Sequence, residues 1–310
     1  MLSPELIKKI KHIQLKAGYQ ATEILAGEYS SVFKGVGIEF DEVREYLPGD
    51  DVRTIDWNVT ARMSHPFVKV FREEREMTLI LMVDVSPSQI FGTTGRSKRE
   101  VAAELAAVLA FLAIKSHDKV GLIIFSNEVE LYIPPKKGRA HIWRIIREVL
   151  THEPKKEFHR EPGQPGTVTD LNSVLDYMLK VTKRKSTCFL ISDFFTDHFE
   201  KTLRLAANRH DVVCVRVEDR RELELVPIGF AEFEDSETGE RFILDTSDES
   251  VRTLFKNTHN NDKKEERELF KRCKIGHFTI GTGDDQVVSP LITFLRERNR
   301  RLKVSHKGVK

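Results

Sequence analysis

Short apolar runs alternate with longer periodic segments along most of this chain, beginning near residue 78. Runs rich in Ile, Val and Leu predict buried strands, and apolar residues three and four positions apart predict helices. Strands that alternate with helices are typical of a mostly parallel sheet covered by helices on both faces. We therefore expect the α/β class, with a doubly wound, mostly parallel sheet of the Rossmann type. Strands are expected at residues 78–84, 119–125, 129–133 (an edge hairpin partner), 186–192, 211–217 and 276–280, and helices at 97–115, 138–150, 170–181, 198–208, 248–271 and 286–302.

The N-terminal part of the chain lacks this alternation. A helix is expected at residues 3–27, because Ser3 can cap it and Pro4 suits its first turn. A glycine-rich segment and short extended pieces follow, one of which, at residues 66–71, alternates like a strand. We expect residues 1–76 to form an appendage of a helix and short strands.

The appendage is expected to pack on a main domain of residues 77–310. Within that domain, aromatic and apolar residues flank the turn Glu237-Thr238-Gly239. This pattern predicts an inserted β-hairpin at about residues 226–246.

The most informative chemical pattern is the end of the predicted strand at 78–84. Asp84 closes an apolar run, and Ser86 and Ser88 follow at alternate positions. These side chains offer hard oxygen ligands, which suit Mg²⁺, Ca²⁺ or Mn²⁺ rather than zinc or copper. The alternative is a strand-end turn in which an Asx or Ser side chain caps the following helix.

Further oxygen ligands are expected at the carboxyl ends of other strands, because open α/β sheets bind ligands at that edge. Thr167 and Thr169 precede the predicted helix at 170–181, and Asp193 follows the predicted strand at 186–192. A folded sheet would bring these residues to Asp84.

Composition limits the cellular setting. The 310 residues carry a formal charge of +2, and the three cysteines, Cys188, Cys214 and Cys273, form no closely spaced pair. An odd number of cysteines without the spacing of a disulfide framework indicates a reducing compartment. Cys188 and Cys214 lie in apolar runs, as core residues do. With no apolar N-terminal leader and no run long enough for a membrane span, we expect a cytoplasmic protein.

Basic residues gather at both ends of the chain. They are interpreted as solvated helix faces and a frayed tail, with contact to an acidic partner or an anionic membrane surface as the alternative. Binding of nucleic acid is not expected, because no aromatic residues are interleaved with the basic ones.

Two classes of function agree with such a site: a metal-dependent interaction protein and a metal-dependent phosphohydrolase. An enzyme needs a nucleophile and a positioned base. The sequence has no P-loop, no G-x-S-x-G motif and no second Asp two residues after Asp84. These absences favour the interaction protein, and any ATP hydrolysis would belong to a partner.

The oxygen-rich pattern resembles the metal-ion-dependent adhesion site of von Willebrand factor A domains. In that family Asp-x-Ser-x-Ser follows the first strand, a Thr precedes a mid-chain helix and an Asp ends the fourth strand. Asp84, Ser86 and Ser88 match the first element, Thr169 the second and Asp193 the third. The glycine that usually follows this last Asp is replaced by Phe194.

Two longer motifs are similar to those of one particular bacterial family. Residues 37–57 (GIEFDEVREYLPGDDVRTIDW) and 68–76 (VKVFREERE) resemble the signature of the bacterial "domain of unknown function fifty-eight" family, and the match extends over nearly the whole chain. The resemblance implies a cytoplasmic von Willebrand A-like protein that works beside a MoxR-type AAA+ ATPase. It also implies a site for Mg²⁺ (or Ca²⁺ or Mn²⁺) made by Asp84, Ser86, Ser88, Thr169 and Asp193. We hypothesise that an Asp or Glu of a protein partner completes the coordination shell.

Overall fold

The computed structural model describes residues 4–27, 39–63, 65–72, 76–153, 169–196, 198–234, 241–284 and 287–307. The chain divides into two compact units. The first consists of Met1–Val32 and Thr78–Lys310, and the second of Phe33–Met77.

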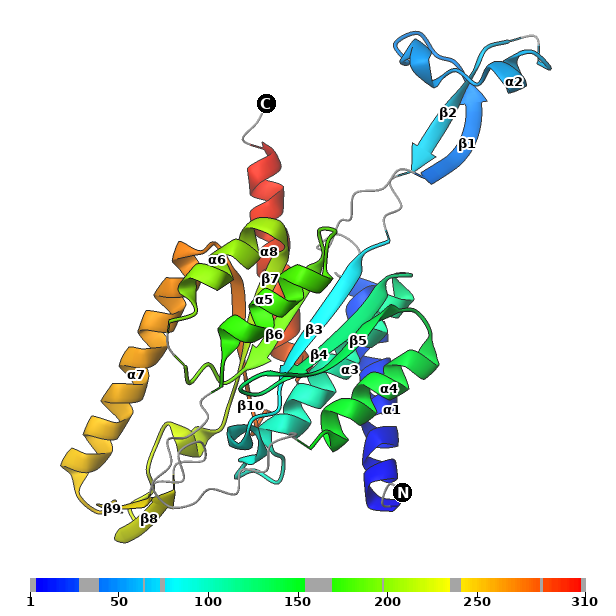
Figure 1. The fold of residues 1–310 in the computed structure, drawn as a ribbon. Helices are drawn as coiled ribbons and strands as arrows, with labels where there is room; N and C mark the ends of the chain where they lie inside the picture. The colour runs from blue at the N-terminus through cyan, green and yellow to red at the C-terminus, as the bar shows by residue number, and fades with distance from the viewer. Residues whose placement is uncertain are drawn as a thin grey trace. The chain divides into compact units, whose positions relative to one another are not determined.

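A six-stranded sheet forms the centre of the first unit, in the order β10-β7-β6-β3-β4-β5 (Figure 1). All neighbours pair in parallel except β4 and β5, which are antiparallel. The predicted mostly parallel sheet, with a hairpin partner at one edge, is confirmed. The strands are β3 (Thr78–Asp84), β4 (Lys119–Phe125), β5 (Val129–Lys136), β6 (Thr187–Ser192), β7 (Asp211–Glu218) and β10 (Gly276–Gly281).

The order of the strands creates a topological switch point beside β3. This strand comes first in the sheet along the chain, and it lies between β4, which follows it, and β6, which comes later. The connection after β3 leads to α3 (Lys98–Lys115) on one face of the sheet and the connection after β6 leads to α6 (Glu200–Arg209) on the other, so a crevice is expected between their carboxyl ends.

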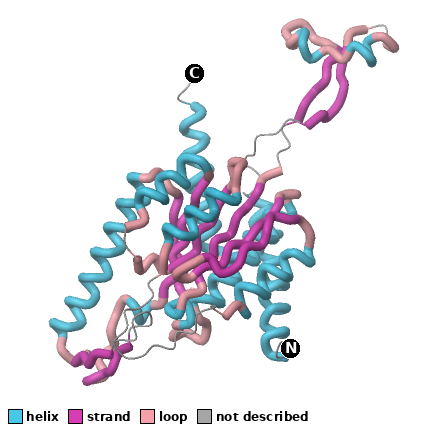
Figure 2. The backbone as a smooth tube through the Cα atoms, in the orientation of Figure 1, coloured by secondary structure: helices cyan, strands magenta, loops and turns pink. Residues whose placement is uncertain are grey.

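Helices cover both faces of the sheet (Figures 1 and 2). Helix α3 lies on one face against β3 and β4, and α1 and α4 pack against α3. Helices α5 and α6 contact strands on the opposite face. The bounds are α1 (Pro4–Gly27), α3 (Lys98–Lys115), α4 (Arg139–Thr151), α5 (Leu171–Val181), α6 (Glu200–Arg209), α7 (Glu249–Arg272) and α8 (Val288–Lys307).

Helix α3 is buried along nearly its whole length because it lies between the sheet and α1. A helix in that position is expected to be mostly apolar, which agrees with its run of Ala and Leu residues. Where α1 crosses it, Gly18 comes close to the ring of Phe111 and Lys16 pairs with Glu104 at 2.6 Å.

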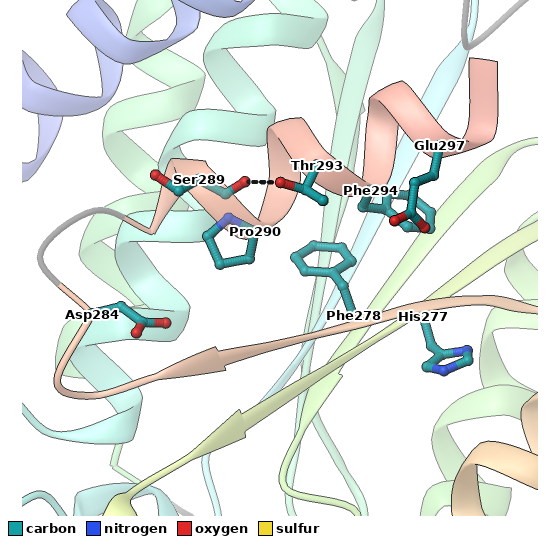
Figure 3. A pocket seen from close by; sticks show the side chains of 8 residues that line it. All are labelled: His277, Phe278, Asp284, Ser289, Pro290, Thr293, Phe294 and Glu297. Carbon is teal, nitrogen blue, oxygen red and sulfur yellow. Dashed lines mark hydrogen bonds between the residues drawn. The ribbon is translucent and has the colours of Figure 1, made fainter. Parts of the chain in front are cut away.

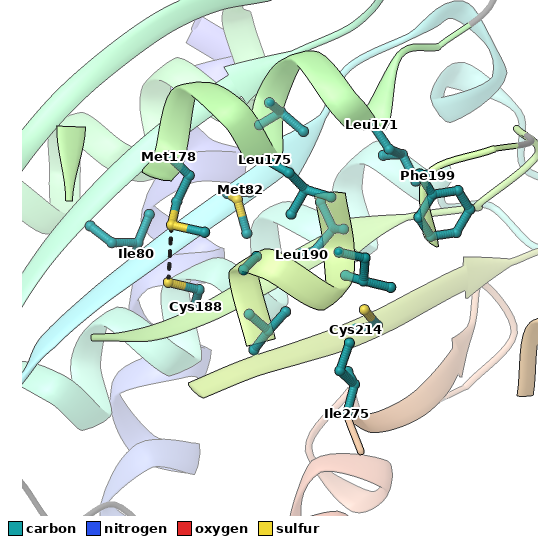
Figure 4. Packing of buried hydrophobic residues seen from close by; sticks show 14 of the residues in the cluster. Ile80, Met82, Leu171, Leu175, Met178, Cys188, Leu190, Phe199, Cys214 and Ile275 are labelled. Carbon is teal, nitrogen blue, oxygen red and sulfur yellow. Dashed lines mark hydrogen bonds between the residues drawn. The ribbon is translucent and has the colours of Figure 1, made fainter. Parts of the chain in front are cut away.

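The core between the sheet and α5 is shown in Figure 4. Alternate residues of β3 and β6, such as Met82 and Leu190, meet Leu175 and Met178 of α5, and all four are fully buried. Cys188 belongs to this core and lies 3.7 Å from the sulfur of Met178. All three cysteines are free and buried, as the sequence predicted for Cys188 and Cys214.

The structure differs from the sequence prediction in three places, and two of these differences have local causes. Strand β5 continues through Pro134 and Pro135 to Lys136, because an edge strand tolerates residues without an N–H. Helix α8 ends at Lys307, later than its apolar pattern indicated. The short helix α2 (Trp57–Thr60) was not predicted; it starts because the side chain of Asp56 accepts from the first-turn amides.

The second unit is a small antiparallel ribbon of β1 (Glu39–Glu45) and β2 (Phe67–Arg72) with α2 between them in the chain. Arg44 and Asp50 form a two-point ion pair at 2.8 and 2.7 Å, and the Asp50 carboxylate also accepts from the amide of Leu47. Much of the signature seen in the sequence thus builds this turn. The side chain of Trp57 is 68% exposed.

The predicted hairpin insertion is present as β8 (Phe230–Glu234) paired antiparallel with β9 (Arg241–Asp245), and the rings of Phe233 and Phe242 stack across it. Its predicted turn, Glu237-Thr238-Gly239, lies outside the described residues.

Within the described residues, no helix combines the length and the apolar composition needed to cross a bilayer.

The core makes a first prediction. Replacing Leu190 by Ala should lower the free energy of unfolding by about 2–5 kcal/mol, because it leaves a cavity in a fully buried strand. The matched control is Leu205→Ala on α6, where the side chain is 58% exposed and the cost should stay within about 0.5 kcal/mol. Urea titrations followed by circular dichroism measure both, and equal costs would contradict this description of the core.

Candidate metal centre

The candidate site lies at the carboxyl edge of the sheet, where β3 and β6 end side by side. Asp84 is the last residue of β3, opposite Phe125 of β4, and Asp193 directly follows β6. Both carboxylates are buried. Parallel pairing of β3 with β6 brings together two residues that are distant in the sequence.

The loop after β3 is shaped by Asp84 and Pro87. One carboxylate oxygen of Asp84 accepts from the amide of Ser86 at 2.9 Å, which is an Asx turn. A short 3-10 helix, Pro87–Ile90, then begins, and the side chain of Ser86 makes no capping bond to it. Instead, the hydroxyls of Ser86 and Ser88 lie 3.0 Å apart.

The end of β6 is tied to this loop by two side-chain hydrogen bonds. The hydroxyl of Ser88 donates to Asp193 Oδ2 at 2.7 Å, and the hydroxyl of Ser192 donates to Asp84 Oδ2 at 2.6 Å. Thus the structure brings Asp84, Ser86, Ser88 and Asp193 into one buried cluster.

Thr169 lies at the same edge, on the side of β4. It is buried, and the amide of the next residue, Asp170, donates to the carbonyl of Ser126, which follows β4. Asp170 then caps α5 by accepting from the amide of Asn172. The other candidate, Thr167, lies outside the described residues.

Sequence reasoning missed two charged members of the cluster, Lys98 and Glu222. The side chain of Lys98 is fully buried, and its ammonium contacts Asp193 at 2.8 Å and also the carboxylate of Glu222. The available signal was a lysine in the first turn of a helix, where a positive charge opposes the helix dipole. Ser192 was also missed, although it directly precedes Asp193.

Burial and neighbouring charges shift the pKa values of three ionisable groups of the cluster. Burial and, to a smaller extent, the neighbouring Asp193 carboxylate together raise the pKa of Asp84 to about 7. Burial also lowers the pKa of Lys98, but the carboxylates of Asp193 and Glu222 outweigh this and hold it above its usual value. Burial raises the pKa of Glu222. Asp193 and Glu222 therefore share the ammonium of Lys98. Asp84 is held instead by hydrogen bonds from a backbone amide and a serine hydroxyl.

The donor set fits a hard divalent cation. Asp84 and Asp193 would supply carboxylate oxygens, Ser86 and Ser88 would supply neutral hydroxyls, and Thr169 would add a third hydroxyl from the same edge of the sheet. Among the described residues, no group of three or more His, Cys, Asp or Glu side chains is placed to hold a metal ion. Any binding there would thus depend on the hydroxyls as well as the carboxylates.

Phe194 directly follows Asp193, at the position where the adhesion-site family usually has a glycine, and its backbone is strained. Its backbone is left-handed, with φ of 57°, a region that favours glycine. Its ring is buried and packs on Phe199 and Phe270, with centroids 6.2 and 5.4 Å away. Aromatic packing in the core thus compensates the strained backbone beside Asp193.

A separate open pocket of about 710 Å³ lies between β10 and α8 (Figure 3). Its lining includes Phe278, Pro290 and Phe294, together with Asp284 and Glu297. The site residues predicted from the sequence do not line it.

Asp84 gives a prediction about stability. In EDTA at pH 8, Asp84→Asn should raise the free energy of unfolding by about 1–3 kcal/mol, because the buried charge is removed while Ser86 N and Ser192 keep a partner. The folded-state pKa of Asp84 is raised, so wild-type stability should fall as pH rises toward 7, and the gain should shrink at pH 5. Thermal unfolding of both proteins at the two pH values measures this, and a loss of stability at pH 8 would contradict it.

Phe194 gives a second prediction. Phe194→Ala should lower the free energy of unfolding by about 3–5 kcal/mol because the ring leaves the core. Phe194→Gly should be up to about 1 kcal/mol more stable than the Ala variant, because glycine adopts the left-handed backbone without strain. Denaturant titrations compare the two, and a glycine variant less stable than the alanine variant would show that this position carries no strain.

Comparison with known proteins places the chain among uncharacterized relatives. It is 29% identical over 307 residues to "Uncharacterized protein Rv1480" of Mycobacterium tuberculosis, covering 98% of this chain and 93% of that protein. "Uncharacterized protein YeaD" of Bacillus subtilis is 29% identical over 129 residues, which are 40% of this chain and 30% of that protein.

Among solved structures, BatB from Bacteroides thetaiotaomicron is similar with 13% identity and a TM-score of 0.45, covering 72% of this chain and 99% of that one. An aerotolerance-related membrane protein from Bacteroides fragilis gives 13% identity and a TM-score of 0.46, covering 73% and 99%. Both likenesses are too loose to assign a function. The family model described as "Protein of unknown function DUF58" matches residues 42–265, and the chain therefore belongs to this family.

Proposed function

We propose that this chain is a metal-dependent protein–protein interaction module with a von Willebrand A-like fold. It would work in the cytoplasm as an adaptor or co-chaperone of a MoxR-type AAA+ ATPase, as its sequence resemblance implies. The ligands proposed are Asp84, Ser86, Ser88, Thr169 and Asp193, and the cation is Mg²⁺, with Ca²⁺ or Mn²⁺ as alternatives.

One contact carries the proposal: the 2.7 Å hydrogen bond from Ser88 Oγ to Asp193 Oδ2, which joins residues 105 positions apart. It unites the loop after the first strand of the sheet with the end of β6, the fourth strand of the sheet in chain order. These are the places where the adhesion-site pattern requires its serines and its second aspartate. Thr169 supports the proposal because it lies before α5 at the same edge.

The residues of the cluster are held in position before any ligand arrives. Asp84 is fixed by the amide of Ser86 and the hydroxyl of Ser192, and Asp193 by Ser88 and Lys98. Neutral hydroxyls make up much of the donor set, so the cluster would leave part of a divalent charge uncompensated. A bound divalent cation supplies Lewis acidity and an affinity for a carboxylate oxygen from outside. This chemistry suits capture of an acidic side chain of a partner.

The proposal predicts metal binding that depends on Asp84. Calorimetric titration with MgCl₂ or MnCl₂ should detect one binding event in the wild type, weakened at least about tenfold in Asp84→Asn. The control Asp176→Asn removes an exposed carboxylate of α5 and should bind as the wild type does. Because Asp84→Asn should stay folded, weaker binding would not reflect unfolding.

Partner capture is tested with a purified MoxR-type AAA+ ATPase from the same organism. The wild type and Asp176→Asn should retain it in Mg²⁺ and release it in EDTA, and Asp84→Asn should fail to retain it. Equal capture by all three proteins in EDTA would refute a metal-dependent interaction. Absence of metal binding in the wild type would refute the site itself.

A further inference from the structure

Lys98 occupies a place that is unfavourable for a lysine unless its charge is compensated. It is fully buried and lies in the first turn of α3, where the helix dipole opposes a positive charge. Lysine is almost never fully buried without a partner. The cap of α3 does not explain it, because Ser97 performs that role by accepting from the amide of Glu100.

Two carboxylates on neighbouring strand ends compensate the Lys98 charge. Asp193 follows β6 and contacts the ammonium at 2.8 Å; Glu222, after β7, contacts it as well. Glu222 is fixed independently, because its other oxygen accepts from the amide of Asp219 at 2.9 Å in a capping box. The ring of Phe195 lies over the ammonium, 5.7 Å from centroid to nitrogen. Lys98 is therefore held firmly between two loops.

The contact with Asp193 concerns the candidate metal centre directly. Asp193 Oδ2 accepts from both Ser88 Oγ and Lys98 Nζ, so the oxygen that faces the serine loop already has a cationic donor. A divalent cation held through Asp193 would share that carboxylate with the ammonium. Two positive groups on one carboxylate repel each other, and burial strengthens this repulsion.

We propose that Lys98 is a built-in counter-cation of the metal centre: it neutralises Asp193 and Glu222 in the metal-free protein and lowers the affinity of the centre for divalent cations. The neutralisation of Asp193 and Glu222 concerns the metal-free protein alone. The effect on metal affinity rests on the proposed function. A centre of this kind stays folded without metal and binds metal weakly.

The test uses two substitutions with opposite expected signs. Lys98→Met keeps the unbranched stem and removes the charge, so affinity for Mg²⁺ and Mn²⁺ should rise by about 10- to 100-fold. In EDTA the same variant should unfold at a lower temperature than the wild type, because Asp193 and Glu222 lose their cation. Glu222→Gln leaves more of the ammonium charge directed at Asp193, so metal affinity should fall.

A matched control separates charge from packing. Lys115→Met removes an exposed lysine at the other end of α3, whose ammonium contacts the hydroxyl of Thr22, and should leave metal affinity unchanged. If Lys98 served only to pack the loops, the charge of Glu222 would not affect the centre, and Glu222→Gln, which keeps the size of the side chain, would bind metal as tightly as the wild type does. That result would overturn the inference, and Glu222→Gln decides it even if Lys98→Met fails to fold.

The outcomes also separate this inference from the proposed function. Metal binding by Lys98→Met but not by the wild type would support the counter-cation and refute a metal-dependent function of the wild-type protein. Metal binding by the wild type that weakens in Lys98→Met would support the function and overturn the counter-cation. No metal binding by either protein, with equal stability in EDTA, would overturn both.

Discussion

The burial of two carboxylates at one end of the sheet is the constraint on which the rest of the site depends. Asp84 and Asp193 lie where parallel strands end, and neither has much access to water. Buried carboxylates need partners of opposite charge or donated hydrogen bonds. The hydroxyls of Ser88 and Ser192, the amide of Ser86 and the ammonium of Lys98 meet this need in the metal-free protein.

The surrounding contacts extend this compensation outward. Glu222, the second partner of Lys98, belongs to the loop that Asp219 organises, and Asp219 accepts from the amide and hydroxyl of Thr93 and from the hydroxyl of Thr282. Loops after β3, β6, β7 and β10 are thereby joined through hydrogen bonds. The carboxyl edge of the sheet thus behaves as one polar network, and a change of charge at Lys98 or Asp193 acts on all of it.

The sequence predicted those parts of the molecule that depend on local pattern. Strand β3 and its boundary at Asp84 follow from an apolar run that ends on a polar residue, and Ser86 and Ser88 follow from their spacing. Asp193 was found because it ends another apolar run at the edge where such sheets bind ligands. In each case, neighbours along the chain carried the information.

Lys98 and Phe194 show where that reasoning stops. Nothing near Lys98 in the sequence indicates that Asp193 and Glu222, which come from other loops, will neutralise it. Similarly, the left-handed backbone of Phe194 is acceptable only because Phe270, on the distant helix α7, packs on its ring. Both features depend on tertiary contacts that a single sequence does not reveal.

Stability alone does not explain such a cluster. Replacing a buried ion pair by apolar residues is often neutral or stabilising, so charges in a core are weak contributors to folding. Here three carboxylates and a lysine occupy a place beside an apolar core that could have extended through them. Phe194 adds backbone strain at the same point. Costs of this kind gather where structure serves binding rather than folding, and they support the proposal that the carboxyl edge of β3 and β6 is the binding site.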